Sequence, residues 1–135
     1  MLPVLDRRSD ESPGASEKQC STAEDLPDRL YLDSGSSGIA LALWHSGVGP
    51  GDEVLLPAFH CPTMADPVRA AGADVVFYRI NADLSPNMDS IRNLLGDRSK
   101  VLLAAHFFAT GQDLVEARRL CDKRHVRLIE DCAHC

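Results

Sequence analysis

The sequence predicts an α/β fold, an incomplete three-layer αβα arrangement around a mainly parallel sheet. From residue 29 onward, short apolar runs alternate with segments long enough to form helices. Strands that alternate with helices imply crossover connections, which place successive strands parallel in one sheet and helices on its faces. With 135 residues and 44% hydrophobic content, the chain has the size and composition of one ordinary globular domain.

The first helix is expected after the small-residue turn Ser34–Gly38, and it should run through Ile39 to about Ser46. Its residues are apolar on nearly every face, which predicts deep burial. The glycine-rich segment 47–51 should end this helix, because glycine supplies a C-terminal cap and proline cannot continue a helix. Glu53–Pro57 is then predicted to be a buried strand.

A second helix is expected within residues 62–71, with Pro67 in its first turn or at a kink, because proline lacks the N–H that a helix interior uses. Asp74–Tyr78 contains two β-branched and two aromatic residues, so it is predicted to be the next strand. Asn87 is a favoured N-cap residue, and it should open a helix over 88–95.

Lys100–Ala105 is another apolar run and a predicted strand. Asp113–Glu116 fits a capping box with Asp113 as the cap, so a helix should begin there. The basic residues Lys123 and Arg124 would lie in its last turn, where they complement the helix dipole. Val126–Ile129 is the last predicted strand.

Residues 1–28 are predicted to be a disordered tail outside the domain of residues 29–135. The segment is rich in Ser, Pro, Glu and Asp and has no hydrophobic period. Such a composition cannot bury enough apolar surface to offset the entropy lost on ordering. The chain ends at Cys135, directly after the last predicted strand, so we expect the N-terminal part of a larger domain.

Charge and hydropathy exclude several classes of function. The net charge of -6 argues against nucleic acid and against an anionic membrane surface as partners. No apolar run approaches the roughly 20 residues that a membrane-spanning helix needs, and the start of the chain does not have the pattern of a secretory signal. The five cysteines are odd in number and scattered, which fits reduced thiols. We therefore expect a cytoplasmic protein.

Three loops with chemically capable residues should meet at one rim of the sheet. They are Ala58–Pro62, His106–Thr110 and Asp131–His134, and each follows a predicted strand. Ligands of open parallel sheets bind beyond the carboxyl ends of the strands. The turn Ser34–Gly38 is either a plain serine N-cap or a phosphate site at a helix start. His106, at a strand end, is predicted to be a satisfied edge histidine.

Asp131 ends an apolar strand, so its carboxylate is either a cap for the residues that follow or a fixed charge facing a cationic ligand atom. The pair Cys132 and Cys135 has the C-x-x-C spacing, and an alternative interpretation is a thiol or zinc site that also uses His134 with Cys61 or His60. No second C-x-x-C pair is present, so we expect no metal.

In order and spacing, these pieces resemble the DegT/DnrJ/StrS family of sugar aminotransferases. The segments that carry the resemblance are Ser34–Ser37 before an apolar helix, Gly49–Pro57, and Ile129–His134 with the sequence Ile-Glu-Asp-Cys-Ala-His. The resemblance covers residues 30–135. It implies the N-terminal part of the large domain of a fold type I transferase that uses pyridoxal 5'-phosphate, and family members are typically homodimers.

The resemblance also implies cofactor-binding roles for particular residues. Ser36 and Ser37 lie where the family binds the cofactor phosphate, and Asp131 matches the aspartate that pairs with the pyridine nitrogen. His134 falls where many members have Gln, near the phenolic oxygen. Many members place an aromatic ring over the cofactor at the position of Cys61; here Phe59 would supply the ring, or the Cys61 sulfur and His60 would replace it.

The family's Schiff-base lysine lies beyond the matching aspartate, and this chain ends four residues after Asp131. The lysines present, Lys18, Lys100 and Lys123, are not expected in the site, so no catalytic residue is assigned. The resemblance implies an enzyme that moves an amino group from a donor such as glutamate to a keto-sugar, nucleotide-linked, and a chain that is inactive alone. The alternative is a non-catalytic α/β binding or regulatory module that docks on a homologue.

Overall fold

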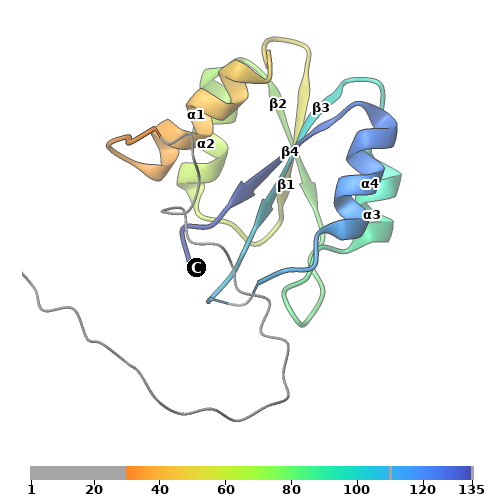
Figure 1. Cartoon of the computed structure of the whole chain (residues 1–135). Coiled ribbons are helices and arrows are strands. Elements are labelled where there is room, and N and C mark those ends of the chain that lie inside the picture. The colour runs from red at the N-terminus through yellow and green to blue at the C-terminus, as the bar shows by residue number, and fades with distance from the viewer. Residues whose placement is uncertain (1–29, 110, 135) are drawn as a thin grey trace, which may run out of the picture.

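The computed structural model describes residues 30–109 and 111–134, and the tail predicted for residues 1–28 lies outside this part of the chain. Four helices alternate with four strands in the described residues (Figure 1). In chain order these elements are α1 (Gly35–His45), β1 (Glu53–Pro57), α2 (Pro62–Ala70), β2 (Asp74–Tyr78), α3 (Met88–Leu94), β3 (Ser99–Ala105), α4 (Val115–Arg124) and β4 (Arg127–Asp131).

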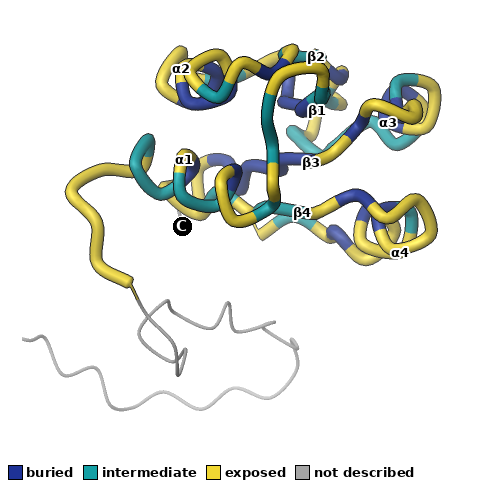
Figure 2. Tube along the Cα trace, turned by 90° about the horizontal axis from the view of Figure 1, so that it is seen from above, coloured by how far each residue is buried: buried dark blue, intermediate teal, exposed yellow. Residues whose placement is uncertain are grey.

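The four strands form one parallel sheet in the order β2-β1-β3-β4, and helices cover both of its faces (Figures 1 and 2). Helices α1 and α2 lie on one face, and α3 and α4 lie on the other. The three-layer α/β fold predicted from the alternation of strands and helices is therefore confirmed. Among the described residues, no helix is long and apolar enough to cross a membrane.

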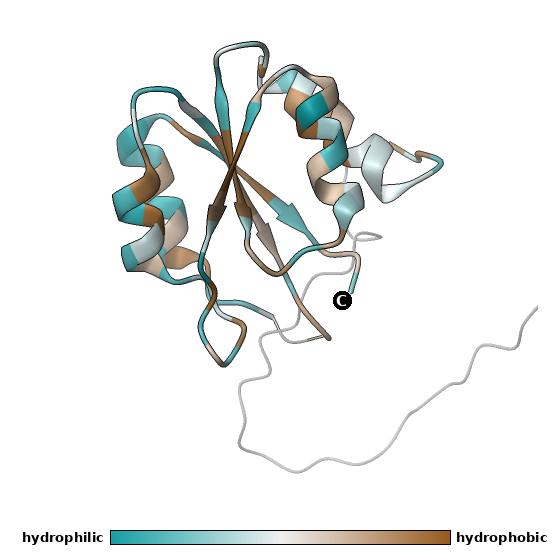
Figure 3. Ribbon diagram, turned by 180° about the vertical axis from the view of Figure 1, so that it is seen from behind, coloured by the Kyte–Doolittle hydropathy of each residue, from teal (hydrophilic) through white to brown (hydrophobic). Residues whose placement is uncertain are grey.

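Alternate residues of the central strands supply two hydrophobic cores. In β3, Val101 and Leu103 pack with α1 and α2, whereas Leu102 and Ala104 pack with α3 and α4. All four side chains are buried, as expected for a strand with helices on both of its faces. Figure 3 shows apolar residues in the middle of the strands and many hydrophilic residues in α3 and α4.

Helix α1 differs from the prediction in its start and in its burial. It begins at Gly35, because the Ser34 hydroxyl accepts a hydrogen bond from the Ser37 backbone N–H and caps the helix there. The predicted deep burial is wrong: Ile39 and Leu43 are buried, but the Trp44 side chain is 76% exposed. Only one face of α1 contacts α2 and the sheet, so the other apolar side chains of the helix remain at the surface.

The cap of α4 also differs from the predicted capping box. The helix begins at Val115 with Leu114 as its N-cap residue, and Asp113 accepts a hydrogen bond from the Val115 N–H instead. Glu116 does not close a box, since its carboxylate pairs with Arg92 of α3. The other cap prediction is confirmed, because the Asn87 side chain accepts a hydrogen bond from the Ser90 N–H at the start of α3.

The Tyr78 hydroxyl supplies a hydrogen bond to β3 that Pro57 of β1 cannot donate. The register of β1 with β3 ends at Leu55 and Leu102, and β1 itself ends in the buried Pro57, which has no N–H to donate. The next carbonyl along β3, that of Leu103, accepts a hydrogen bond of 3.0 Å from the Tyr78 hydroxyl. Burial raises the pKa of Tyr78, so the hydroxyl stays protonated and remains a donor at neutral pH.

We expect Tyr78→Phe to lower the free energy of unfolding by about 1–3 kcal/mol, because it leaves the buried Leu103 carbonyl without its donor. Urea unfolding of the full chain measures this change. Tyr31→Phe is the matched control, since Tyr31 is 85% exposed and its hydroxyl contributes little. Equal unfolding midpoints for the two variants would contradict the assignment.

Candidate functional site

The order of the strands creates a place for a ligand between β1 and β3. From β1 the chain passes through α2 to β2 on one side, and from β2 it returns through α3, past β1, to β3 on the other side. The connections that leave β1 and β3 therefore diverge over opposite faces of the sheet. In open α/β sheets such a switch point leaves a crevice beyond the carboxyl ends of the strands, where ligands bind.

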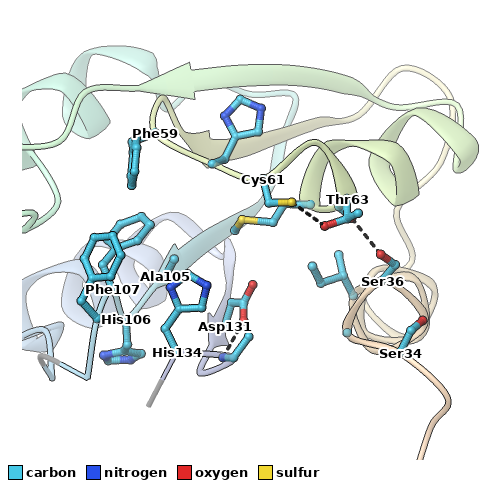
Figure 4. A pocket seen from close by; sticks show the side chains of 16 residues that line it. Ser34, Ser36, Phe59, Cys61, Thr63, Ala105, His106, Phe107, Asp131 and His134 are labelled. Carbon is cyan, nitrogen blue, oxygen red and sulfur yellow. Dashed lines mark hydrogen bonds between the residues drawn. The ribbon is translucent and has the colours of Figure 1, made fainter.

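A cavity of about 630 Å³ lies at this switch point, within the range of small-molecule sites. Its walls come from the start of α1 and from the segments that follow β1, β3 and β4 (Figure 4). The three loops predicted to meet at one rim of the sheet therefore meet. The cavity also takes in residues from α1 and the first turn of α2.

The residue before α1 and the first two residues of the helix line the cavity. As the first two helical residues, Gly35 and Ser36 have no earlier turn of the helix to accept their N–H groups, and the described residues provide no other partner. The third amide, that of Ser37, is already bonded to the Ser34 hydroxyl at 3.2 Å. Two free N–H donors at the positive end of a helix form a site for an anion.

Of the two serines predicted to bind phosphate, only Ser36 lines the cavity. The hydroxyl of Ser37 is 2.9 Å from that of Ser34, and Ser37 is not among the lining residues. Ser34 and Gly35 belong to the turn predicted as a possible phosphate site but were given no individual binding role, and they line the cavity. The start of α1 at Gly35 causes this difference, because it turns Ser37 away from the cavity.

Ser36 also ties α1 to α2 through a carbonyl that Pro67 leaves free. Pro67 lies inside α2 rather than in its first turn, and it has no N–H for the carbonyl of Thr63, four residues earlier. The Ser36 hydroxyl donates to that carbonyl at 3.2 Å (Figure 4). The proline therefore fixes the position of the Ser36 side chain at the edge of the cavity.

We expect Ser36→Ala to lower the free energy of unfolding by about 1 kcal/mol in the natural chain. The loss should shrink in a Pro67→Ala background, because the restored N–H at position 67 then donates to Thr63. A double-mutant cycle from urea unfolding measures this coupling. Ser37→Ala serves as control and should lower the free energy of unfolding by the same amount in both backgrounds. If the loss caused by Ser36→Ala does not depend on the residue at position 67, the proposed role of the bond from Ser36 to Thr63 is contradicted.

The Asp131 carboxylate accepts a hydrogen bond within the turn after β4 and also lies at the cavity. One carboxylate oxygen accepts a hydrogen bond of 2.9 Å from the Ala133 N–H, which shapes the turn after β4. The half-buried side chain also lines the cavity, and Figure 4 shows its second oxygen directed into the open space. The turn thus orients a carboxylate toward the cavity.

His134 and the loop after β3 lie side by side at the rim. The Ala109 N–H donates to the His134 carbonyl at 2.7 Å, and the rings of Phe108 and His134 have centroids 5.8 Å apart. His134 lines the cavity, as does Phe108. The structure therefore brings the predicted residue His134 to the cavity on the same turn as Asp131.

Aromatic rings form another wall of the cavity. Phe59 packs at 5.4 Å from Phe107 and at 6.5 Å from Phe108, measured between ring centroids. His60 lies next in the chain, but its ring stacks on Phe77 at 4.6 Å. Of the two rings that the sequence offered, Phe59 belongs to the aromatic wall, and His60 also lines the cavity while its ring stacks on Phe77 of β2.

Cys61 is the N-cap residue of α2 and lines the cavity with its exposed thiol. The Thr63 hydroxyl donates to the Cys61 sulfur at 3.1 Å. This bond, with one from the Thr63 backbone, lowers the pKa of the Cys61 thiol below its ordinary value. Thr63 lines the cavity too, and no pattern in the sequence singled it out.

We expect Cys61 to react with iodoacetamide at a lower pH than an ordinary thiol, because more of it is thiolate at neutral pH. Thr63→Val removes the donor, so the pH profile of the reaction should move upward. Peptide mapping by mass spectrometry measures the rate at each cysteine. Cys121 is the internal control: burial raises its pKa to about 11 and encloses its sulfur, so it should stay unmodified. An unchanged profile in Thr63→Val would contradict the assignment.

The cavity contains no amine or metal centre from the described residues. Lys100 lies on β3 and Lys123 on α4, both are exposed, and neither lines the cavity. Within residues 30–109 and 111–134, no group of three or more His, Cys, Asp or Glu side chains is placed to hold a metal ion. Cys135, which the zinc alternative requires, lies outside the described residues.

The fold and the cavity define an open α/β protein with a cavity at the switch point of a parallel sheet. Residues 29–135 match the family model of the DegT/DnrJ/EryC1/StrS aminotransferases. The chain belongs to this family, as the resemblance in the sequence implied.

Individual relatives agree with the family match. The chain is 35% identical over 101 residues to L-glutamine:2-deoxy-scyllo-inosose aminotransferase of Streptomyces kanamyceticus, covering 74% of this chain and 24% of that protein. The crystal structure of the aminotransferase TlmJ from Streptoalloteichus hindustanus superposes with a TM-score of 0.69 at 38% identity, over 73% of this chain and 27% of that one.

A third similar protein was solved with its cofactor. The structure of NtdA from Bacillus subtilis with bound cofactor PMP superposes with a TM-score of 0.69 at 27% identity, over 73% of this chain and 23% of that one. The present chain spans between 24% and 28% of the length of the curated relatives that it matches.

Proposed function

We propose that residues 29–135 are the N-terminal part of the large domain of a pyridoxal 5'-phosphate-dependent aminotransferase and that they hold the cofactor. One observation carries the proposal: the start of α1, where two amides have no partner among the described residues, and Asp131 line the same cavity. An anion-binding helix start and a fixed negative charge are the two features that this cofactor, with a phosphate and a basic ring nitrogen, requires.

The residues around the cavity match the chemical groups of the cofactor. The amides of Gly35 and Ser36 would receive the phosphate, and the Asp131 oxygen that is directed into the cavity would pair with the ring nitrogen. Phe59 offers an aromatic face, and a ring nitrogen of His134 can donate to the phenolic oxygen. Ser37 would contribute indirectly, through its bonds to Ser34.

When bound, pyridoxal phosphate accepts the electrons left on an amino acid that loses its α-proton. Asp131 serves that chemistry because a carboxylate beside the ring nitrogen favours its protonated form. The Ala133 N–H holds this carboxylate in a fixed orientation. The turn after β4 therefore acts as the electrostatic support of the site.

We propose a keto-sugar or a related cyclic ketone, nucleotide-linked in the sugar case, as the amino acceptor, and glutamate or glutamine as the amino donor. The names of the similar proteins support this class of substrate, since one is a glutamine-dependent aminotransferase of 2-deoxy-scyllo-inosose and another a GDP-perosamine synthase. The exposed apolar side chains of Leu30, Tyr31 and Trp44 support a homodimer, which the resemblance to the family predicts.

The described residues supply no amine to the cavity, so we propose that this chain alone binds the cofactor reversibly and does not transaminate. The lysine for covalent attachment would come from a segment beyond the part of the family that this chain matches. This accounts for a cavity that has an anion site and a carboxylate but no amine among its described lining residues.

We expect the full 135-residue chain to bind pyridoxal 5'-phosphate and Asp131→Asn to weaken that binding by about tenfold or more, the loss expected for one charged hydrogen bond. The asparagine carbonyl still accepts from Ala133, so the turn should persist. Absorbance and fluorescence titration measure the affinity. Asp97→Asn, at the opposite end of the sheet, is the matched control. Equal affinity of Asp131→Asn and the natural chain would contradict the pairing.

Borohydride treatment of the loaded chain separates reversible from covalent binding. We expect no lysine to carry a reduced cofactor adduct in stoichiometric yield, as read by mass spectrometry. A mass-shifted lysine at full yield would overturn the proposed inactivity of the chain alone, while leaving the proposed cofactor site intact.

A further inference from the structure

The imidazole of His106 joins two segments that carry the candidate site. His106 is the residue after β3, and it is buried, with 8% of its surface exposed. Its Nδ1 lies 3.0 Å from the backbone nitrogen of Gln112, and its Nε2 lies 3.0 Å from a carboxylate oxygen of Glu130 on β4. Each ring nitrogen therefore has a partner, and the two partners belong to different parts of the chain. This confirms the prediction that both ring nitrogens of His106 have hydrogen-bond partners.

The partners determine the tautomer of the ring. A backbone N–H can only donate, so Nδ1 accepts from Gln112 and carries no proton. A carboxylate only accepts, so Nε2 carries the proton and donates it to Glu130. His106 is thus a neutral imidazole with its proton on Nε2. Protonation of Nδ1 would remove the bond to Gln112.

The loop that His106 closes has an unfavourable backbone. Phe108 and Ala109 are consecutive residues with φ values of +51° and +60°, in the left-handed region that non-glycine residues seldom adopt. Such a conformation persists only where surrounding contacts impose it. The bond from Gln112 to His106 closes the loop from its far side, and the Ala109 N–H binds the His134 carbonyl from its near side.

The same ring reaches the strand end that presents the carboxylate. Glu130 is adjacent to Asp131, and the His106 backbone N–H donates to the Asp131 carbonyl at 3.0 Å. The side chain of His106 therefore binds Glu130, and its backbone binds Asp131, the next residue of β4. These contacts set where β4 ends and where the turn with Ala133 and His134 begins.

We propose that His106 is a positioning residue of the cofactor site: its neutral imidazole clamps the loop after β3 to the end of β4 and so fixes Asp131 and His134 at the cavity. The inference rests on the proposed function for the identity of the ligand, but the clamp itself does not. His106 acts through the two segments that it joins.

Two substitutions separate the two bonds of the ring. In His106→Asn, the amide oxygen can take the place of Nδ1 and accept from Gln112, but the side chain is too short for Glu130. In His106→Gln, the amide nitrogen can take the place of Nε2 and donate to Glu130, leaving the Gln112 N–H unbonded to the side chain. Glu130→Gln keeps an acceptor for Nε2 and serves as the conservative variant. His125→Asn is the matched control, since His125 is the exposed, left-handed C-cap of α4, where asparagine is well tolerated.

The experiment uses the full chain and three measurements. A long-range ¹H–¹⁵N spectrum should show the His106 proton on Nε2. Amide hydrogen exchange should be faster by about tenfold or more at Ala109 and Ala133 in both His106 variants, and faster at Gln112 in His106→Gln alone. Titration with pyridoxal 5'-phosphate should show about a tenfold loss of affinity in both variants. Glu130→Gln and His125→Asn should behave as the natural chain.

The outcomes separate the clamp from the proposed function. A proton on Nδ1, or unchanged exchange at Ala109 and Ala133 in both variants, overturns the clamp whether or not cofactor binds. Normal cofactor affinity in both His106 variants, with a natural chain that binds, overturns the positioning role. A natural chain that does not bind cofactor overturns the proposed function. In that case the hydrogen-exchange data still test whether His106 holds the loop after β3 to the end of β4. If one His106 variant fails to fold, the other gives the same decision.

Discussion

The reversal of strand order between β1 and β3 is the constraint on which the rest of the molecule depends. Because parallel strands need crossover helices, the chain leaves these neighbouring strands toward opposite faces of the sheet. The loops after them cannot fill the space at their ends, and the cavity is the result. Apolar side chains on both faces of β3 hold this arrangement, so the position of the site follows from how the core is packed.

The charges around the cavity follow the directions of the elements. Helices α1 and α2 both begin at the cavity, so both turn their positive ends toward it, whereas the turn after β4 brings the Asp131 carboxylate. A ligand with an anionic end and a cationic end is favoured over one of uniform charge. The Thr63 carbonyl, which Pro67 leaves without a helix donor, accepts from the Ser36 hydroxyl, and this bond links the starts of the two helices. The His106 contacts do the same for the loop after β3 and the end of β4.

Much of this could be predicted from the sequence because buried strands of a parallel sheet are continuous apolar runs, and the loops after them must share one edge. The sequence could not predict which residue in a run of similar residues would take a given role. Three serines follow Asp33, and the choice of Ser34 as the cap decided that Ser36, rather than Ser37, lines the cavity. The burial of α1 was overestimated because hydropathy records how apolar a face is, not whether another element covers it. Thr63 and the partners of His106 depend on contacts between distant segments, which spacing along the chain does not contain.

Two prolines make main-chain hydrogen bonding in this fold depend on side chains from other elements. Pro57 and Pro67 each withhold a main-chain donor from a regular element, and in each case a hydroxyl from elsewhere, Tyr78 or Ser36, completes the unmade bond. Neither β1 nor α2 can therefore reach its full complement of bonds as an isolated unit. Completion requires that β2 be correctly aligned and that α1 be docked. Partly assembled states are left incompletely bonded, which makes assembly of this half of the molecule more nearly all-or-none.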